Sequence, residues 1–359
     1  MIDTTELTTD NRALLERFRE GKKLGLARGI SLVENERPGF QEFLHAVLEK
    51  PRFARRVGFT GPPGAGKSSL VAALTRAYRD RGDEVGVVAV DPTSPFSGGA
   101  LLGDRIRMND LATDPGIFIR SMATRGSVGG LATTTTEVLD LMDAFGFRGV
   151  LVETVGVGQT ELEITRAADT VVVILVPESG DAIQAMKAGL MEIADIFVVN
   201  KADRPGAERL EKDLKLAIHL REGEALRDVP AHHGVDLRRL GTTVSNEDSG
   251  SKGKAPAAWE IPVLQTVAQN GKGVPELLEG IERHRAFLEE TGELALRREA
   301  RAAGRVRDVV ERGLRRVAWD HDGVRRLLEE GVPKIVAGRE TPYSLAAAIM
   351  AELLGSGTP

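Results

Sequence analysis

The sequence predicts an α/β fold with a mostly parallel central sheet flanked by helices, and helical extensions at both ends. Three observations lead to this fold class. Short runs rich in β-branched residues recur from residue 57 onward, helix-compatible segments separate several of them, and a glycine-rich loop joins the first run to a helix. Continuous apolar strands that alternate with helices are typical of a parallel sheet covered on both faces.

The expected elements follow one another in a regular order. Helical spacing of Leu14, Leu15 and Phe18 indicates helix within residues 1–56. The expected strands are 57–60, 85–90, 149–153, 170–176, 195–199 and 261–264. Helices are expected at 67–81, 130–145 and 206–222, and again after about residue 275.

Composition narrows the range of functions. The 359 residues include no cysteine, which excludes disulfides, thiolate metal sites and cysteine nucleophiles. A net charge of −5 gives no general reason to expect nucleic acid or an anionic membrane as a partner. The N-terminus lacks the apolar core of a signal peptide, and no apolar run is long enough to cross a bilayer. We therefore expect a cytoplasmic protein with no nucleic-acid or membrane partner.

The stretch GPPGAGKSS, residues 61–69, predicts a phosphate-binding loop and hence a P-loop NTPase. It fills every fixed position of G-x-x-x-x-G-K-[ST], between a strand-like run and a helix-like run. Backbone N–H groups of such a loop surround the phosphates, Lys67 would reach the β- and γ-phosphates, and Ser68 would bind Mg²⁺. A glycine-rich turn that only caps a helix is the alternative. The expected nucleotide contacts are Gly61, Pro62, Pro63, Gly64, Ala65, Gly66, Lys67, Ser68 and Ser69.

A second motif, NKAD, predicts that the base is guanine. It directly follows the strand-like run IFVV. The carboxylate of Asp203 would accept hydrogen bonds from the guanine N1–H and exocyclic amine, whereas adenine offers no donor at either position. Asn200 and Lys201 would support the loop and cover the base, and a polar turn after a strand is the alternative. Backbone N–H groups expected at the guanine carbonyl oxygen are those of Thr266, Val267 and Ala268. We expect GTP and GDP as the bound nucleotides.

Two acidic residues stand where expected strands end. Asp91 closes VAVD, and Glu153 closes GVLVE. Because ligands of open α/β sheets collect at the carboxyl ends of the strands, Asp91 is placed to hold Mg²⁺. Glu153 would hold the metal through water or orient the attacking water, and Gly156 would let the following loop sense the γ-phosphate. For both acids, a helix cap or turn former is the alternative.

The segment 93–108, TSPFSGGALLGDRIRM, is glycine-rich and then charged. Its composition suits a mobile lid that carries Asp104 to the metal, or Arg105 or Arg107 to the phosphates. A solvated loop is the alternative for this segment.

Five segments together resemble one protein family. They are GPPGAGKSS, VDPTSPFSGGALLGDRIRM, RSMATRGSVGGLA (120–132), ETVGVGQTE (153–161) and NKAD. The family is the methylmalonyl-CoA mutase-associated GTPases, of the MeaB/ArgK type in the SIMIBI class, and the resemblance spans about residues 10–290. It implies a homodimer that hydrolyses GTP with Mg²⁺ as chaperone of an adenosylcobalamin-dependent acyl-CoA mutase of the methylmalonyl-CoA mutase type. Such a chaperone gates cofactor loading and protects or reactivates the mutase.

The resemblance also implies roles for individual residues. It places Lys67, Asp104 and Glu153 in catalysis and four residues at the Mg²⁺ ion: Ser68, Asp91, Asp104 and Glu153. It implies that PESGDAIQAMKAG (177–189) relays the nucleotide state, whereas the residues alone favour a plain helix start. The polar candidates of that segment are Asp181, Gln184 and Lys187. The chain departs from the family at 223–258, which is longer than expected, and we assign no role to the histidine pair at 232–233 within it.

Residues 297–316 predict an interaction helix. They hold eight arginines against three acidic residues, with an apolar stripe of Val306, Val310, Leu314 and Val317. The narrow stripe fits a helix–helix seam better than a nucleic-acid surface, and the resemblance assigns this region to dimerisation. A solvated arm packed on its own domain is the alternative. The expected domains are a helical N-terminal extension (1–56), a P-loop GTPase domain (57–290) with a flexible insert at about 245–258, and a helical C-terminal dimerisation arm (291–359).

Two other activities remain open. A metallochaperone GTPase of the same class would need cysteine or histidine clusters, and the chain has no cysteine and six dispersed histidines. A small-molecule kinase, which the ArgK label implies, would need an acceptor-binding domain, and no segment is left over to form one.

Overall fold

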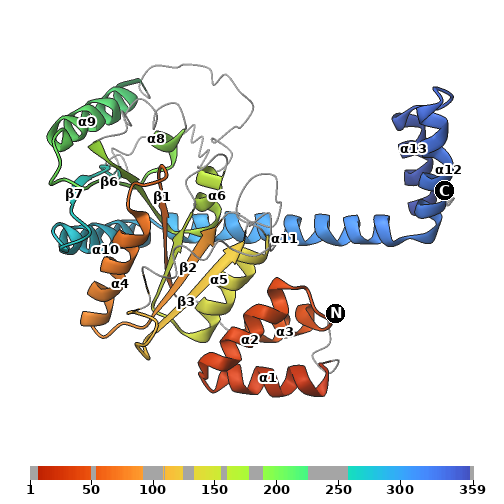
Figure 1. The fold of residues 1–359 in the computed structure, drawn as a ribbon, viewed down its shortest axis with the longest axis horizontal. Helices are drawn as coiled ribbons and strands as arrows, with labels where there is room; N and C mark the ends of the chain where they lie inside the picture. The colour runs from red at the N-terminus through yellow and green to blue at the C-terminus, as the bar shows by residue number, and fades with distance from the viewer. Residues whose placement is uncertain are drawn as a thin grey trace, which may run out of the picture. The chain divides into compact units, whose positions relative to one another are not determined.

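A parallel sheet is the centre of the computed structural model (Figure 1). The structure describes residues 7–49, 54–91, 108, 110–123, 133–154, 160–177, 189–224 and 258–355. The chain forms two compact units, Met1–Arg298 and Glu299–Pro359. The histidine pair at 232–233 and residues 245–257 of the predicted insert lie outside the described residues.

The sheet of the first unit has seven strands among the described residues, and all neighbouring pairs are parallel. The strands are β1 (Arg55–Thr60), β2 (Val85–Asp91), β3 (Ile117–Ala123), β4 (Gly149–Glu153), β5 (Thr170–Leu175), β6 (Ile196–Asn200) and β7 (Val263–Thr266). Their order across the sheet is β3-β2-β4-β1-β5-β6-β7. Because β1 lies at the centre, the loop that follows it opens beside the ends of β4 and β5. The predicted α/β fold with a parallel sheet is confirmed.

Strand β3 was not predicted from the sequence. Its residues, IFIRSMA, lie at the edge of the sheet, pair only with β2, and are mostly half-buried. An edge strand has one neighbour and a partly solvated surface, so it lacks the continuous apolar run that marks the central strands. Arg120 interrupts the run, and its guanidinium pairs with Glu34. The NKAD motif therefore follows the sixth strand of the chain, where the sequence predicts the fifth.

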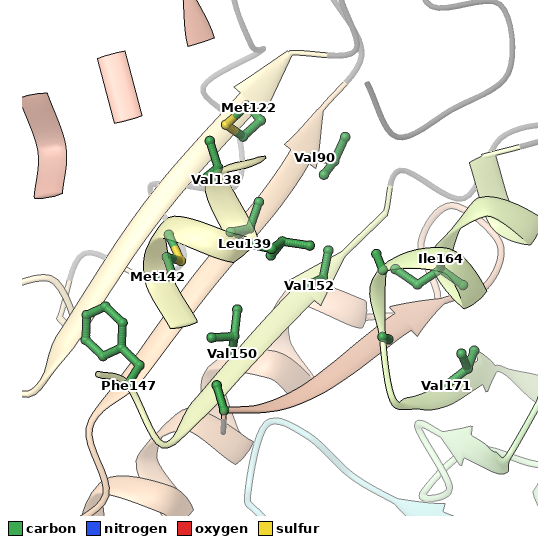
Figure 2. Close-up of a cluster of buried hydrophobic side chains, with 14 of the residues drawn as sticks. Val90, Met122, Val138, Leu139, Met142, Phe147, Val150, Val152, Ile164 and Val171 are labelled. Carbon is green, nitrogen blue, oxygen red and sulfur yellow. The ribbon is translucent and has the colours of Figure 1, made fainter. Parts of the chain in front are cut away.

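Helices cover both faces of the sheet, because alternate residues of each strand point to opposite sides. Val172 and Ile174 of β5 join one apolar cluster, and Val171, Val173 and Leu175 join the other. The first cluster includes residues of α4 (Lys67–Asp80) and α10 (Val274–Glu290). The second includes residues of α5 (Thr133–Phe145), α6 (Thr160–Ala167), α8 (Leu190–Ile193) and α9 (Ala207–Glu224). Figure 2 shows part of the second cluster, with Val150 and Val152 of β4 beside Leu139 and Met142 of α5.

The N-terminal helices belong to the same unit as the sheet. They are α1 (Thr9–Arg19), α2 (Lys23–Glu34) and α3 (Phe40–Leu48). The Phe18 ring meets the rings of Phe43 and Phe145 with centroid distances of 6.0 and 5.3 Å, so α1 packs on both α3 and α5. Division of the chain at residue 56 stays a proposal.

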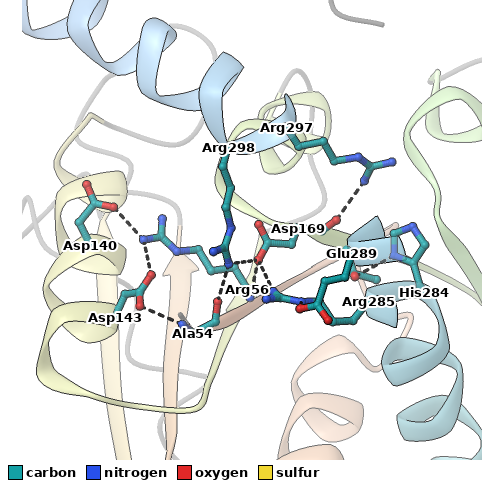
Figure 3. A network of polar contacts seen from close by, with 11 residues as sticks. Ala54, Arg56, Asp140, Asp143, Asp169, His284, Arg285, Glu289, Arg297 and Arg298 are labelled. Carbon is teal, nitrogen blue, oxygen red and sulfur yellow. Dashed lines mark hydrogen bonds and ion pairs between the residues drawn. The ribbon is translucent and has the colours of Figure 1, made fainter. Parts of the chain in front are cut away.

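A buried polar cluster joins the amino ends of β1 and β5 to the helices (Figure 3). Arg56, only 5% exposed, donates to Asp140 at 2.8 Å and to Asp143 at 3.0 Å. Burial alone would lower the pKa of Arg56, but the two carboxylates outweigh it, and the pKa lies above its usual value. Asp143 also accepts a hydrogen bond from the backbone N–H of Ala54 at 2.9 Å. The cluster thus holds the start of β1 on helix α5.

Two further carboxylates hold the start of α11 (Glu293–Asp320). Asp169 accepts from Arg298 at 3.1 Å and from Arg285 at 3.3 Å (Figure 3). Asp195 accepts from Arg297 at 3.1 Å. Burial raises the pKa of Asp195, but its contacts with His284 and Arg297 outweigh this, and the net pKa lies below its usual value. The second turn of α11 is therefore tied by ion pairs to the residues just before β5 and β6.

The second unit contains two helices that follow α11. These are α12 (Asp322–Val336) and α13 (Pro342–Leu353), which pack through Val324, Leu345 and Ile349. The predicted stripe on α11 is solvent-exposed: Val306, Val310, Leu314 and Val317 have between 52% and 65% of their surface exposed. Among the helices in the described ranges, none is long and apolar enough to cross a membrane.

Candidate nucleotide-binding site

The loop after β1 adopts a backbone that requires glycine at two positions. Gly66 has φ +86° and forms the N-cap of α4, and Gly61 has φ +139°. A Cβ at Gly66 would collide with the side-chain amide of Asn200, and one at Gly61 would collide with the carbonyl oxygen of Ile174. Both positions therefore exclude larger residues for two reasons: the positive φ disfavours a side chain, and the neighbouring atoms leave no space for a Cβ.

The side chain of Lys67, at the end of this loop, bonds back to the start of the loop. Its ammonium donates to the carbonyl oxygens of Gly61 at 2.9 Å and Pro62 at 3.0 Å. The backbone carbonyls thus point to the ammonium, and the first turn of α4 begins at the same residue. A positive side chain and a helix N-terminus are combined at one point, which is the arrangement that binds phosphate groups.

Ser68 and Glu153 meet beside this loop. The hydroxyl of Ser68 donates to Glu153 Oε1 at 2.6 Å, and both residues are buried. Glu153 is the last residue of β4 and lies in register with Phe59 of β1 and Ala89 of β2. A hydroxyl and a carboxylate oxygen side by side are the ligand types that Mg²⁺ prefers, so these two residues fit a magnesium site.

Asn200 connects the phosphate loop with the segment after β7. Its side-chain amide donates to the Ala65 carbonyl at 2.8 Å. Its carbonyl oxygen accepts from the Thr266 hydroxyl at 3.1 Å and from the Ala268 N–H at 3.2 Å. One buried side chain at the end of β6 therefore sets the distance between the loop and the segment at 266–268.

A pocket of about 540 Å³ opens over these residues. Eight of the predicted site residues line it: Pro63, Gly64, Gly66, Lys67, Ser68, Ser69, Glu153 and Lys201. Four lining residues were not predicted from the sequence: Ala89, Val90, Thr154 and Gln269. Thr154 braces the pocket wall, because its hydroxyl donates to Thr60 Oγ1 at 3.1 Å. Thr154 and Val90 lie within the segments ETVGVGQTE and VDPTSPFSGGALLGDRIRM. Gln269 directly follows the predicted contact Ala268, whereas no motif marks Ala89.

Other predicted residues lie around the pocket without lining it. Gly61, Pro62, Ala65 and Asn200 form its support. Asp203 lies on an exposed turn after Lys201, which has φ +56°. Thr266, Val267 and Ala268 do not line the pocket either, and Thr266 and Ala268 bond to Asn200.

Several predicted residues cannot be placed in this geometry. The backbone of Asp91 ends β2, in register with Ala123, and the described structure does not include its side chain. Asp104, Arg105, Arg107 and Gly156 lie outside the described residues. The same is true of the proposed relay residues Asp181, Gln184 and Lys187.

The profile of one protein family matches most of the chain. It is described as methylmalonyl Co-A mutase-associated GTPase MeaB, and it matches residues 26–322. The chain belongs to this family. The match covers the whole sheet and helices α10 and α11.

Two similar proteins are named as GTPases, and one solved structure shares the fold. A putative GTPase of Pyrococcus abyssi is 43% identical over 344 residues, which are 96% of this chain and 97% of that protein. A probable GTPase of Mycobacterium tuberculosis is 36% identical over 336 residues, 92% of each chain. The crystal structure of an LAO/AO transport system kinase has a TM-score of 0.64 at 24% identity, over 97% of this chain and 99% of that chain. This last similarity concerns the fold alone. The MeaB-family chain is thus a P-loop protein among relatives named as GTPases.

Proposed function

We propose that this MeaB-family protein binds GTP with Mg²⁺ in the pocket over residues 61–69 and hydrolyses it to GDP and phosphate. The observation that carries the proposal is the meeting of Lys67, Ser68 and Glu153 in one pocket, at a phosphate loop braced by Asn200. We further propose that this cycle serves an adenosylcobalamin-dependent acyl-CoA mutase, gates its cofactor loading and protects or reactivates it. The family description, which names a methylmalonyl-CoA mutase-associated GTPase, supports this partner.

In the proposed reaction, Lys67 and Glu153 have different tasks. The ammonium of Lys67 would exchange its carbonyl partners for the β- and γ-phosphate oxygens and stabilise the charge that develops there. The carboxylate of Glu153 would orient the attacking water. Ser68 and Glu153, together with Asp91 and Asp104, are the proposed ligands of Mg²⁺, which would neutralise phosphate charge when bound. Gly156 is the proposed sensor of the γ-phosphate.

Replacing Asp203 with asparagine tests the base. We expect GTP affinity to fall by about 1–3 kcal/mol, at least fivefold, because the variant loses the carboxylate that would accept from guanine N1–H and the exocyclic amine. Affinity for xanthosine triphosphate should rise, since xanthine has a carbonyl oxygen where guanine has its amine. Displacement of a fluorescent guanine nucleotide measures both affinities. Glu208→Gln, an exposed carboxylate on the first turn of α9, is the matched control. Unchanged GTP affinity in Asp203→Asn would reject guanine recognition by this motif.

The partner is tested by the rate of phosphate release. We expect slow hydrolysis by the protein alone and an increase of about tenfold or more with the mutase it serves, because a partner can supply missing transition-state contacts. Methylmalonyl-, isobutyryl- and ethylmalonyl-CoA mutases are the candidates to add. Equal rates with and without all three would contradict the chaperone role. Transfer of the γ-phosphate to a small-molecule acceptor would instead indicate a kinase, and tight Ni²⁺ or Zn²⁺ binding a metallochaperone.

We also propose that the protein is a cytoplasmic homodimer. The exposed stripe on α11 supports the dimer, because four aliphatic side chains at helical spacing are more stable against a partner helix than in water. The apolar contact between α12 and α13 is small and buries little surface. It therefore contributes little stability to these helices by itself, which also supports a dimer.

A further inference from the structure

A tight turn after β7 brings Gln269 to the nucleotide pocket. Val267 and Lys272 form an isolated antiparallel bridge, and the N–H groups of Asn270 and Gly271 both donate to the Val267 carbonyl at 3.1 Å. Gly271 has φ +77°, which lets the chain reverse within a few residues. Gln269 lies at the tip of this turn, is exposed, and lines the pocket together with Lys201.

The neighbouring backbone donors are engaged within the protein. The N–H of Val267 donates to the Lys272 carbonyl at 2.9 Å, and the N–H of Ala268 donates to Asn200 Oδ1 at 3.2 Å. Either group would have to give up its partner before it could bind a base. Gln269 follows them directly, and among residues 267–272 of this turn it is the one that lines the pocket.

Two edges of guanine present different hydrogen-bonding groups, and one of these edges suits the side chain of Gln269. Guanine presents hydrogen donors, N1–H and the exocyclic amine, on the edge that Asp203 is proposed to read, and two acceptors, O6 and N7, on the adjoining edge. A glutamine amide carries two N–H donors and can supply them to such acceptors. The side chain of Lys201, a residue that also lines the pocket, would cover the face of the base.

We propose that Gln269 is a base-contacting residue whose side-chain amide donates to the O6 and N7 edge of guanine. This inference rests on the proposed GTP site. It divides recognition of the base between two turns: the one after β6 carries Asp203, and the one after β7 carries Gln269. Asn200 fixes the second turn to the phosphate loop through Thr266 and Ala268.

The test measures nucleotide affinity of the full chain with Mg²⁺. Gln269→Met keeps the length of the side chain and removes the amide, and we expect GTP to bind about fivefold more weakly. Gln269→Glu replaces donors with acceptors and should weaken GTP further. Gln265→Met is the matched control, because that amide lies in β7, four residues before Gln269, and bonds to Glu211 outside the pocket. It should bind GTP as the unsubstituted protein does.

Two nucleotide analogues separate a base contact from a structural role. 7-Deaza-GTP lacks N7, and 2-aminopurine ribonucleoside triphosphate lacks O6 together with N1–H, so each penalty is measured against the unsubstituted protein with the same nucleotide. If Gln269 contacts that edge, Gln269→Met should lose most of its penalty with at least one analogue. An equal penalty with GTP and both analogues would overturn the inference, as would GTP affinity unchanged in Gln269→Met. Failure of the unsubstituted protein to bind any guanine nucleotide would instead overturn the proposed function.

Discussion

Replacing Lys67 with alanine is expected to lower GTP hydrolysis by about 10²- to 10³-fold, which corresponds to about 3–4 kcal/mol of transition-state stabilisation. Lys67 is the pocket residue whose ammonium lies against the loop carbonyls of Gly61 and Pro62, at 2.9 and 3.0 Å. In the proposed reaction the ammonium exchanges these carbonyl partners for β- and γ-phosphate oxygens, where it would stabilise the charge that develops on the γ-phosphate. Single-turnover phosphate release at saturating GTP measures the effect.

The control for this prediction is Lys212→Ala, which removes an exposed ammonium from α9. Its hydrolysis rate should match that of the unsubstituted protein. Because Lys67 also holds the loop, thermal unfolding of both variants should show that the sheet remains folded. A Lys67→Ala variant that is folded, binds GTP and hydrolyses it within about threefold of the original rate would contradict the assigned role.

Replacing Arg56 with methionine is expected to destabilise the first unit by about 3–5 kcal/mol. The substitution removes the guanidinium that lies 2.8 Å from Asp140 and 3.0 Å from Asp143, and it leaves two carboxylates in a buried environment without that charge. Removing one member of a buried ion cluster costs more than the cluster contributes, because the remaining charge stays desolvated. Denaturant unfolding, followed by Trp259 fluorescence in a Trp319→Phe background, reports on the first unit alone.

An exposed arginine provides the comparison. Arg148 is 69% exposed in its side chain and lies 3.3 Å from Asp83, so Arg148→Met should cost about 0–1 kcal/mol. The combined variant Arg56→Met, Asp140→Asn, Asp143→Asn should recover part of the lost stability, because it also removes the two charges. Similar small losses for Arg56→Met and Arg148→Met would show that the buried cluster does not hold β1 on α5.

The local elements of the fold are largely predictable because each follows from a short-range pattern. Continuous apolar runs mark the central strands, and the glycines at 61–66 mark the loop. Strand β3 is not predicted by this pattern, because an edge strand with one neighbour tolerates Arg120 in its middle. Gln269 is not predictable for another reason: Asn270 and Gly271 are typical of a turn, but only the order of the strands brings that turn to the pocket.

A glycine-rich loop, an NKAD turn and strand-terminal acids can all be recognised in the sequence, as can the family that the chain resembles. Spacing and residue type are local properties, so they are visible in the sequence. Which of these groups meet depends on how the chain folds. Ser68 contacts Glu153 across 85 residues, and Asn200 contacts Ala65 across 135, because the sheet order places β4 beside β1 and brings the end of β6 to the same edge. Strand order depends on how the helices pack on both faces, and no short stretch of sequence encodes that packing.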